Sequence, residues 1–116
     1  MLVIIYHNPR CSKSRATLAL LRERGVEPQV IRYLDTPPDA AELGRIARKL
    51  GLPPRDMLRT GENVWKELGL DAASVDEHTL LETMAANPIL IERPIVVVGD
   101  RARIGRPPEQ VLELLG

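Results

Sequence analysis

The chemistry of this 116-residue chain centres on its one cysteine, Cys11, which lies in the polar segment YHNPRCSKSR. With one cysteine, the chain cannot form an internal disulfide or a metal site built from cysteines alone. A lone cysteine is either an inert core residue or a reactive thiol. We predict a reactive thiol, because the surrounding polar side chains leave no apolar stripe for a core cysteine to join. These neighbours are Asn8, Arg10, Ser12, Lys13 and Ser14.

The position of Cys11 between a predicted strand and a predicted helix favours its thiolate form. At the start of a helix, unpaired N–H groups and the positive end of the helix dipole stabilise negative charge. Arg10, Lys13 and Arg15 add positive charge nearby in the sequence, and we expect His7 within reach across the loop. The sequence therefore predicts a thiol whose pKa lies below that of a free cysteine.

Ser14 occupies the position at which dithiol oxidoreductases carry a second cysteine, since the motif here is Cys-x-x-Ser. A serine cannot act as a resolving thiol, so a redox cycle needs an external thiol such as glutathione. We expect the hydroxyls of Ser12 and Ser14 to donate hydrogen bonds to the sulfur or to a bound oxyanion. A phosphatase-type loop would need an arginine six positions after the cysteine, and Thr17 at that position excludes this class.

Hydrophobic periodicity and turn residues predict the elements that position this loop. Strands are expected at 2–6, 29–33, 89–91, 95–98 and 102–104, and helices at 12–24, 40–50, 62–68, 77–86 and 109–115, with a short helical turn at 53–58. A βαβ half, a helical insertion at about 37–87 and a ββα half follow one another. We therefore predict an α/β, thioredoxin-like fold in a single domain over residues 1–116.

Bulk composition limits the classes of partner. The formal net charge is zero, with one Trp, two Tyr and no Phe, so neither bulk attraction to nucleic acid nor a base-stacking platform is expected. No apolar run approaches the ~20 residues that span a bilayer, and the N-terminus resembles a buried strand more than a signal peptide. We predict a cytoplasmic monomer that binds neither nucleic acid nor membrane.

Four segments together resemble the glutaredoxin-coupled arsenate reductase family over essentially the whole chain. They are HNPRCSKSR near the N-terminus, LRTGE in the insertion, NPILIERPIVV before the hairpin and IGRPPEQVLELL at the end. The resemblance implies that Cys11 attacks arsenate, with His7 and Ser14 as its catalytic neighbours in the loop. It also implies that three arginines hold the oxyanion or the arsenic intermediate, namely Arg59, Arg93 and Arg106.

The resemblance further implies the co-substrates and the geometry of the site. The Cys11 adduct with arsenate would react with glutathione and then with a glutaredoxin, and no metal or bound cofactor would be required. We expect the three arginines to converge on Cys11 and the Arg93–Pro94 peptide bond to be cis. The Arg93 carbonyl or a neighbouring N–H would then be free to pair with glutathione. Apart from the resemblance, we expect Trp65 to belong to the core and not to a cofactor site.

Two other functions stay open on the sequence alone. Spx-like transcriptional regulators have the same fold and bind RNA polymerase without catalysis, but they often carry Cys-x-x-Cys. The Cys-x-x-Ser motif and the retained arginines disfavour that class. A glutathione-dependent reductase of another substrate would carry the same motifs as an arsenate reductase.

Overall fold

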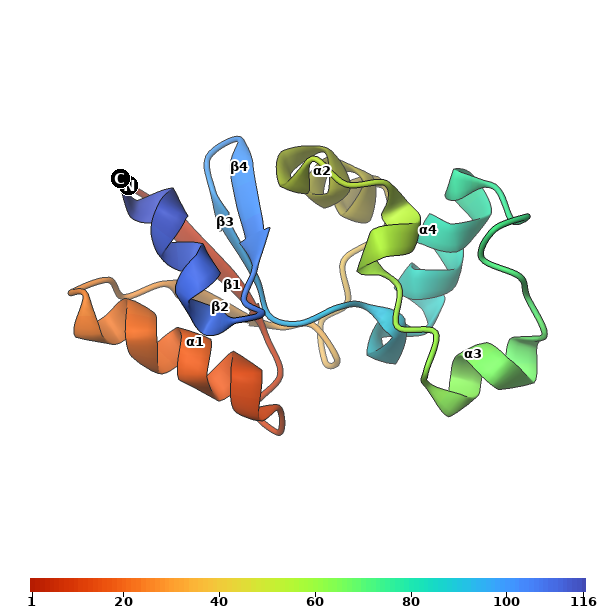
Figure 1. Ribbon diagram of the computed structural model, residues 1–116, viewed down its shortest axis with the longest axis horizontal. Helices are drawn as coiled ribbons and strands as arrows, with labels where there is room; N and C mark the ends of the chain where they lie inside the picture. The colour runs from red at the N-terminus through yellow and green to blue at the C-terminus, as the bar shows by residue number, and fades with distance from the viewer. The chain divides into compact units, whose positions relative to one another are not determined.

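Strand β1 (Val3–His7) is a central strand of a four-stranded sheet in the computed structural model, which describes residues 1–116. The strand order is β2-β1-β3-β4, where β2 is Gln29–Arg32, β3 is Ile95–Val98 and β4 is Arg101–Ile104. β1 pairs with β2 in parallel and with β3 antiparallel. β4 returns antiparallel to β3, and Figure 1 shows these two strands joined by a turn. This is the thioredoxin-like arrangement predicted from the element order.

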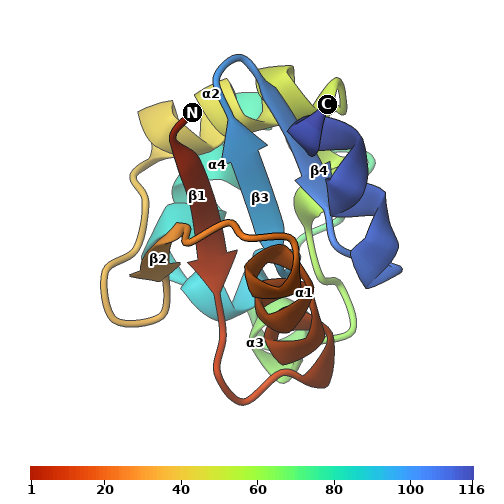
Figure 2. The same ribbon diagram turned by 90° about the vertical axis from the view of Figure 1, so that its left-hand side faces the viewer.

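One face of this sheet is covered by α1 (Ser12–Glu23) and by a C-terminal 3-10 helix (Pro108–Leu115), both in front of the sheet in Figure 2. Apolar side chains from the two central strands meet apolar side chains of both helices there. This core contains Val3, Ile5, Leu21, Val96, Val111 and Leu114. Because α1 follows β1 after a short loop and packs on this face, the start of α1 and Cys11 lie at the carboxyl end of β1.

The chain divides into two units, one of residues 1–36 with 93–116 and one of residues 37–92. The second unit is helical, and the insertion predicted at about 37–87 falls within it. Its elements are α2 (Ala40–Leu50), a 3-10 helix (Pro54–Met57), α3 (Asn63–Leu68), α4 (Glu77–Ala86) and a second 3-10 helix (Pro88–Leu90). Trp65 is buried, as predicted. Neither unit contains a helix long and apolar enough to cross a bilayer.

Two predicted elements are wrong. Residues 89–91 do not form a strand; Pro88–Leu90 is a 3-10 turn, and Ile91 makes one isolated antiparallel bridge to Leu58. Pro88 has no N–H for a ladder, and its fixed φ suits the first position of a helical turn. The closing segment is a 3-10 helix instead of an α-helix, and its buried Val111 and Leu114 stand three residues apart, which matches the 3-10 period.

The Arg93–Pro94 peptide bond is cis, as predicted. A second cis bond joins Arg106 to Pro107, and the sequence did not predict it. Both bonds lie in the sheet-containing unit, one before β3 and one after β4.

Candidate active site

Cys11 is the N-cap residue of α1, with the extended backbone angles φ −95° and ψ 123°. Its N–H donates to the carbonyl of Asn8 at 3.0 Å, and its own carbonyl accepts the N–H of Arg15 at 3.0 Å. These two bonds fix the backbone on both sides of the thiol. The residue is also partly exposed, so a side chain on this fixed backbone remains accessible from solvent.

The environment of Cys11 lowers the pKa of its thiol. Partial burial taken alone raises that pKa, but the backbone N–H of Ser14, the side chain of Arg93 and the backbone N–H of Lys13 together outweigh it, helped by the positive charge of Arg93. Cys11 makes no strict side-chain cap hydrogen bond, so the two N–H groups at the helix start act on the sulfur chiefly as oriented dipoles. This confirms the predicted direction and the predicted contribution of the helix start, but the cation that acts is Arg93, whereas the sequence pointed to Arg10, Lys13 and Arg15.

Two guanidinium groups from distant parts of the chain reach the sulfur. Arg106 Nη2 lies 3.8 Å from Cys11 Sγ, and the Arg93 side chain donates a hydrogen bond to the same thiol. Arg106 Nε also donates to the Arg93 carbonyl at 2.8 Å, which ties the two arginine segments together. The convergence predicted for Arg93 and Arg106 is therefore present within the first unit.

The bond from Arg106 corrects one expectation. The sequence predicts that the Arg93 carbonyl or a neighbouring N–H is free to pair with glutathione; the carbonyl instead accepts a hydrogen bond from the Arg106 guanidinium, and the alternative of a neighbouring N–H stays a prediction. The same bond aims the rest of the Arg106 fork at the thiol.

His7 and Ser14 form a buried pair behind the cysteine loop. His7 Nδ1 lies 2.7 Å from Ser14 Oγ, which also accepts the Asn8 N–H at 3.0 Å. Burial, followed by the charges of Arg32, Arg22 and Arg15, lowers the pKa of His7, so the imidazole is neutral at pH 7. A neutral ring that accepts the Ser14 O–H at Nδ1 satisfies all three groups.

His7 thus contributes a hydrogen bond and no positive charge to the site. The Ser14 hydroxyl, expected to face the sulfur or an oxyanion, faces His7 and Asn8 instead, and it is Ser14's backbone N–H that interacts with the thiol. Ser14 is fully buried, so its hydroxyl must find hydrogen-bond partners inside the loop, and the His7 ring and the Asn8 N–H need a partner in turn.

Arg59 lies in the second unit, between two carboxylates. Its Nη1 is 2.8 Å from Glu92 Oε1 and its Nε is 3.3 Å from Glu62 Oε1. Burial taken alone lowers the pKa of Arg59, but these two carboxylates outweigh it and raise the pKa. The Arg59 backbone is held on both sides as well, because its N–H donates to the Leu90 carbonyl at 2.7 Å and its carbonyl accepts the Glu62 N–H at 3.4 Å. The role of Arg59 toward Cys11 stays a prediction.

The cations that flank Cys11 in the sequence are exposed: Arg10, Lys13 and Arg15. Arg15 Nη1 donates to the Pro9 carbonyl at 2.9 Å and so braces the loop. The sequence analysis gives Asn8 no role beyond that of a polar neighbour of Cys11, although the Asn-Pro pair is a turn signal. Its carbonyl accepts the Cys11 N–H, and its Oδ1 accepts the Arg10 N–H at 3.0 Å.

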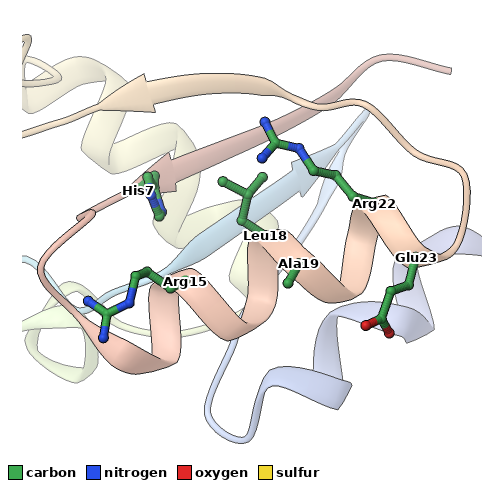
Figure 3. Close-up of a pocket in the computed structure, with 6 residues that line it drawn as sticks. All are labelled: His7, Arg15, Leu18, Ala19, Arg22 and Glu23. Atoms are coloured by element: carbon green, nitrogen blue, oxygen red, sulfur yellow. The ribbon is translucent and has the colours of Figure 1, made fainter.

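An open groove of about 590 Å³ runs along α1 beside this loop. Figure 3 shows His7 at one end of it, with side chains of α1 along its length: Arg15, Leu18, Ala19, Arg22 and Glu23. A smaller cavity of about 200 Å³ also borders His7 and is lined by residues 8–10, 32, 34 and 35. Cys11 lines neither, so the thiol is presented outside both hollows.

A thioredoxin-like sheet that presents one cysteine of lowered pKa at a helix start, with two guanidiniums beside the sulfur, defines a thiol-based class of protein. The ArsC family model matches residues 6–114. The chain belongs to this ArsC family.

Relatives and solved structures agree with this membership. The chain is 56% identical over 115 residues to the Escherichia coli K12 protein called uncharacterized protein YfgD, covering 98% of this chain and 97% of the relative. It is 52% identical over 112 residues to an arsenate reductase of Neisseria meningitidis serogroup A, covering 96% of each. The structure of an arsenate reductase from Vibrio cholerae superposes with a TM-score of 0.95 at 55% identity, covering 98% of each chain.

Proposed function

We propose that this protein reduces arsenate to arsenite through Cys11. One observation carries the proposal: a thiol with a lowered pKa lies within reach of the Arg93 and Arg106 guanidiniums. Arsenate is a tetrahedral oxyanion, and the guanidinium fork matches such oxygens. Two positive charges next to the nucleophile allow an anionic thiolate to approach an anionic substrate. The relatives named arsenate reductase support the choice of oxyanion.

In the first step, the Cys11 thiolate attacks arsenic and forms an S–As bond, and one oxygen leaves as water after taking up protons. A glutathione thiol displaces a second oxygen, also as water, and gives a mixed adduct that still holds As(V). A glutaredoxin thiol then attacks the glutathione sulfur. The S–As bond to glutathione breaks, its electron pair reduces arsenic to As(III), and the two thiols leave as a disulfide. Hydrolysis releases arsenite and restores Cys11.

Arg93 and Arg106 would neutralise the oxyanion throughout, and the buried His7–Ser14 pair would hold the loop in which Cys11 sits. Cys11, Arg93 and Arg106 come from one chain, which suits a monomer. A free reactive thiol suits the cytoplasm, where glutathione keeps thiols reduced. The external thiol is needed because Ser14 takes the place of a resolving cysteine.

The test is a coupled assay with arsenate, glutathione, glutaredoxin and glutathione reductase, in which NADPH oxidation reports turnover. We expect arsenate-dependent turnover that Cys11→Ser abolishes. Arg106→Gln should lower kcat/KM by on the order of 10²-fold, as removal of one oxyanion donor does. Arg101→Gln, at an exposed arginine of β4, is the matched control and should leave turnover unchanged.

The pattern of failure separates the possibilities. Wild-type protein that shows no arsenate-dependent turnover would overturn the choice of substrate. Turnover that needs arsenate but persists in Cys11→Ser would overturn the mechanism. Turnover with glutathione alone, unaffected by glutaredoxin, would overturn the proposed second thiol. If the wild-type protein shows no turnover but captures RNA polymerase, the alternative of an Spx-like transcriptional regulator would be favoured.

A further inference from the structure

Gly105 lies at the point where three segments of the cysteine-bearing unit meet. It follows β4 directly and precedes Arg106. Its N–H donates to the carbonyl of Pro94 at 2.9 Å. The first turns of α1 lie on its other side, through the side chain of Thr17.

There is no room for a side chain at this glycine. A Cβ built on Gly105 would stand 2.5 Å from Thr17 Oγ1 and 2.8 Å from Pro94 Cγ. Both neighbours are fixed. Thr17 is fully buried and donates to the Lys13 carbonyl at 2.8 Å, and the Pro94 side chain is closed into a ring on its own backbone nitrogen, so it cannot rotate away. A methyl group here must therefore push the backbone segments apart, because interiors of this density have no space to absorb it.

The three segments that pack closely at Gly105 are also the segments that surround the Cys11 thiol. Arg93–Pro94 carries one guanidinium that donates to Cys11, and Arg106 carries the other. The turn from Lys13 to Thr17 belongs to the helix start whose N–H groups face the sulfur. The Arg106 to Arg93 bond at 2.8 Å spans the same junction.

We propose that Gly105 is a positioning residue for the reaction, because its missing side chain sets how closely Arg93, Arg106 and the start of α1 approach Cys11. The effect of Gly105 on turnover rests on the proposed function, whereas its effect on the thiol does not.

The direct test is Gly105→Ala, read out by the pH dependence of Cys11 alkylation with iodoacetamide. We expect the pKa of Cys11 to rise toward that of a free thiol, because the guanidinium donors move away from the sulfur. In the arsenate assay, kcat/KM should fall by on the order of 10²-fold, the cost of a misplacement of about 1 Å. Gly44→Ala is the matched control, since a Cβ at that helical glycine meets its neighbours at 3.6 Å and 3.7 Å.

A purely structural role would lower the melting temperature of Gly105→Ala and leave the alkylation profile of the folded protein unchanged; that result would overturn the proposal. Thr17→Ala with Gly105→Ala relieves one close contact and leaves the one with Pro94. The double variant should therefore show a Cys11 pKa between those of Thr17→Ala and Gly105→Ala. If Gly105→Ala does not fold, the comparison of the double variant with Thr17→Ala replaces it, and identical profiles contradict the proposal.

The alkylation series contains no arsenate. Wild-type protein that fails in the arsenate assay would therefore overturn the proposed function and leave the positioning role of Gly105 to be decided by the thiol alone.

Discussion

At the scale of single residues, the lowered pKa of the Cys11 thiol results from opposed effects on one sulfur. Partial burial disfavours the thiolate, and it is outweighed by the N–H groups of Ser14 and Lys13 and by Arg93. Arg93 acts in two ways, by a hydrogen bond and by its charge. A guanidinium that lies beside the thiolate is also the group that an incoming oxyanion would meet.

Arg93→Gln should therefore raise the pKa of Cys11. The substitution removes the positive charge and the guanidinium donor, both of which favour the thiolate. The measurement is the rate of iodoacetamide alkylation against pH, with Arg101→Gln as the control. The same profile in wild type and Arg93→Gln would show that Arg93 does not contribute to the thiol's acidity.

His7 makes stability depend on pH in a defined direction. Its pKa lies below the ordinary ~6.5, chiefly because of burial. As pH falls below ~6.5, an unfolded His7 takes up a proton while the folded one stays neutral. The unfolded state then binds more protons, so stability is lost as pH falls from ~6.5 toward the folded pKa.

We expect the melting temperature to fall between pH 7.5 and pH 5, and His7→Gln to reduce that fall. His78→Gln is the matched control, because His78 is the other histidine and is exposed. Each variant is compared with itself at the two pH values, so a general loss of stability does not affect the result. An equal fall in wild type and His7→Gln would contradict the assignment.

At the scale of elements, the N-cap residues of three helices have two different roles. Cys11 caps α1 without a strict side-chain hydrogen bond, which leaves the sulfur available for chemistry. In the helical unit, Asp39 and Asp76 make ordinary caps, and each accepts the N–H of the third residue of its helix, Glu42 at 2.8 Å and Thr79 at 2.7 Å. The same position thus holds the thiol in one helix and a capping carboxylate in two others.

Loss of the α2 cap should destabilise the protein without altering the thiol. Asp39→Ala leaves the Glu42 N–H without its acceptor and should cost about 1 kcal/mol. Asp39→Asn keeps a side-chain oxygen for this N–H and should cost much less. Urea unfolding followed by circular dichroism measures both variants. Equal losses in the two would mean that the charge of Asp39, and not its cap bond, stabilises α2.

At the scale of the whole molecule, the formal net charge of zero conceals two opposite halves. The unit of residues 1–36 and 93–116 has ten Lys and Arg and six Asp and Glu, a formal charge of +4. Residues 37–92 have six basic and ten acidic residues, a formal charge of −4. Cys11 belongs to the positive unit, which suits attraction of an anionic substrate.

This charge should be measurable with two alkylating agents. Anionic iodoacetate should react with Cys11 faster, relative to neutral iodoacetamide, than it does with the isolated peptide NPRCSKSR. The ratio should fall as ionic strength rises from about 0.01 M to about 1 M, because the Debye length shrinks from about 30 Å to about 3 Å. If the iodoacetate-to-iodoacetamide rate ratio of the protein equals that of the peptide at every salt concentration, the attraction of the anion is due to Arg10, Lys13 and Arg15 alone.

The features that the sequence determined are local ones. Cys11 at a helix start, the Asp39 and Asp76 caps and the order of strands and helices each depend on residues within one or two turns of each other, so periodicity and turn chemistry predict them. The missing resolving thiol at Ser14 is also a matter of spacing. The strand predicted at 89–91 is absent because an apolar run looks the same in a strand and in a buried turn.

Tertiary structure decided which groups surround the sulfur. Arg106 stands 95 residues from Cys11 in the sequence, and only the pairing of β1 with β3, followed by the hairpin to β4, brings it and Arg93 to the thiol. The same packing turns the Ser14 hydroxyl away from the sulfur, keeps His7 neutral and leaves Gly105 no room for a side chain. Distances, burial and charge between remote segments arise from the packed fold, which no local pattern of residues encodes.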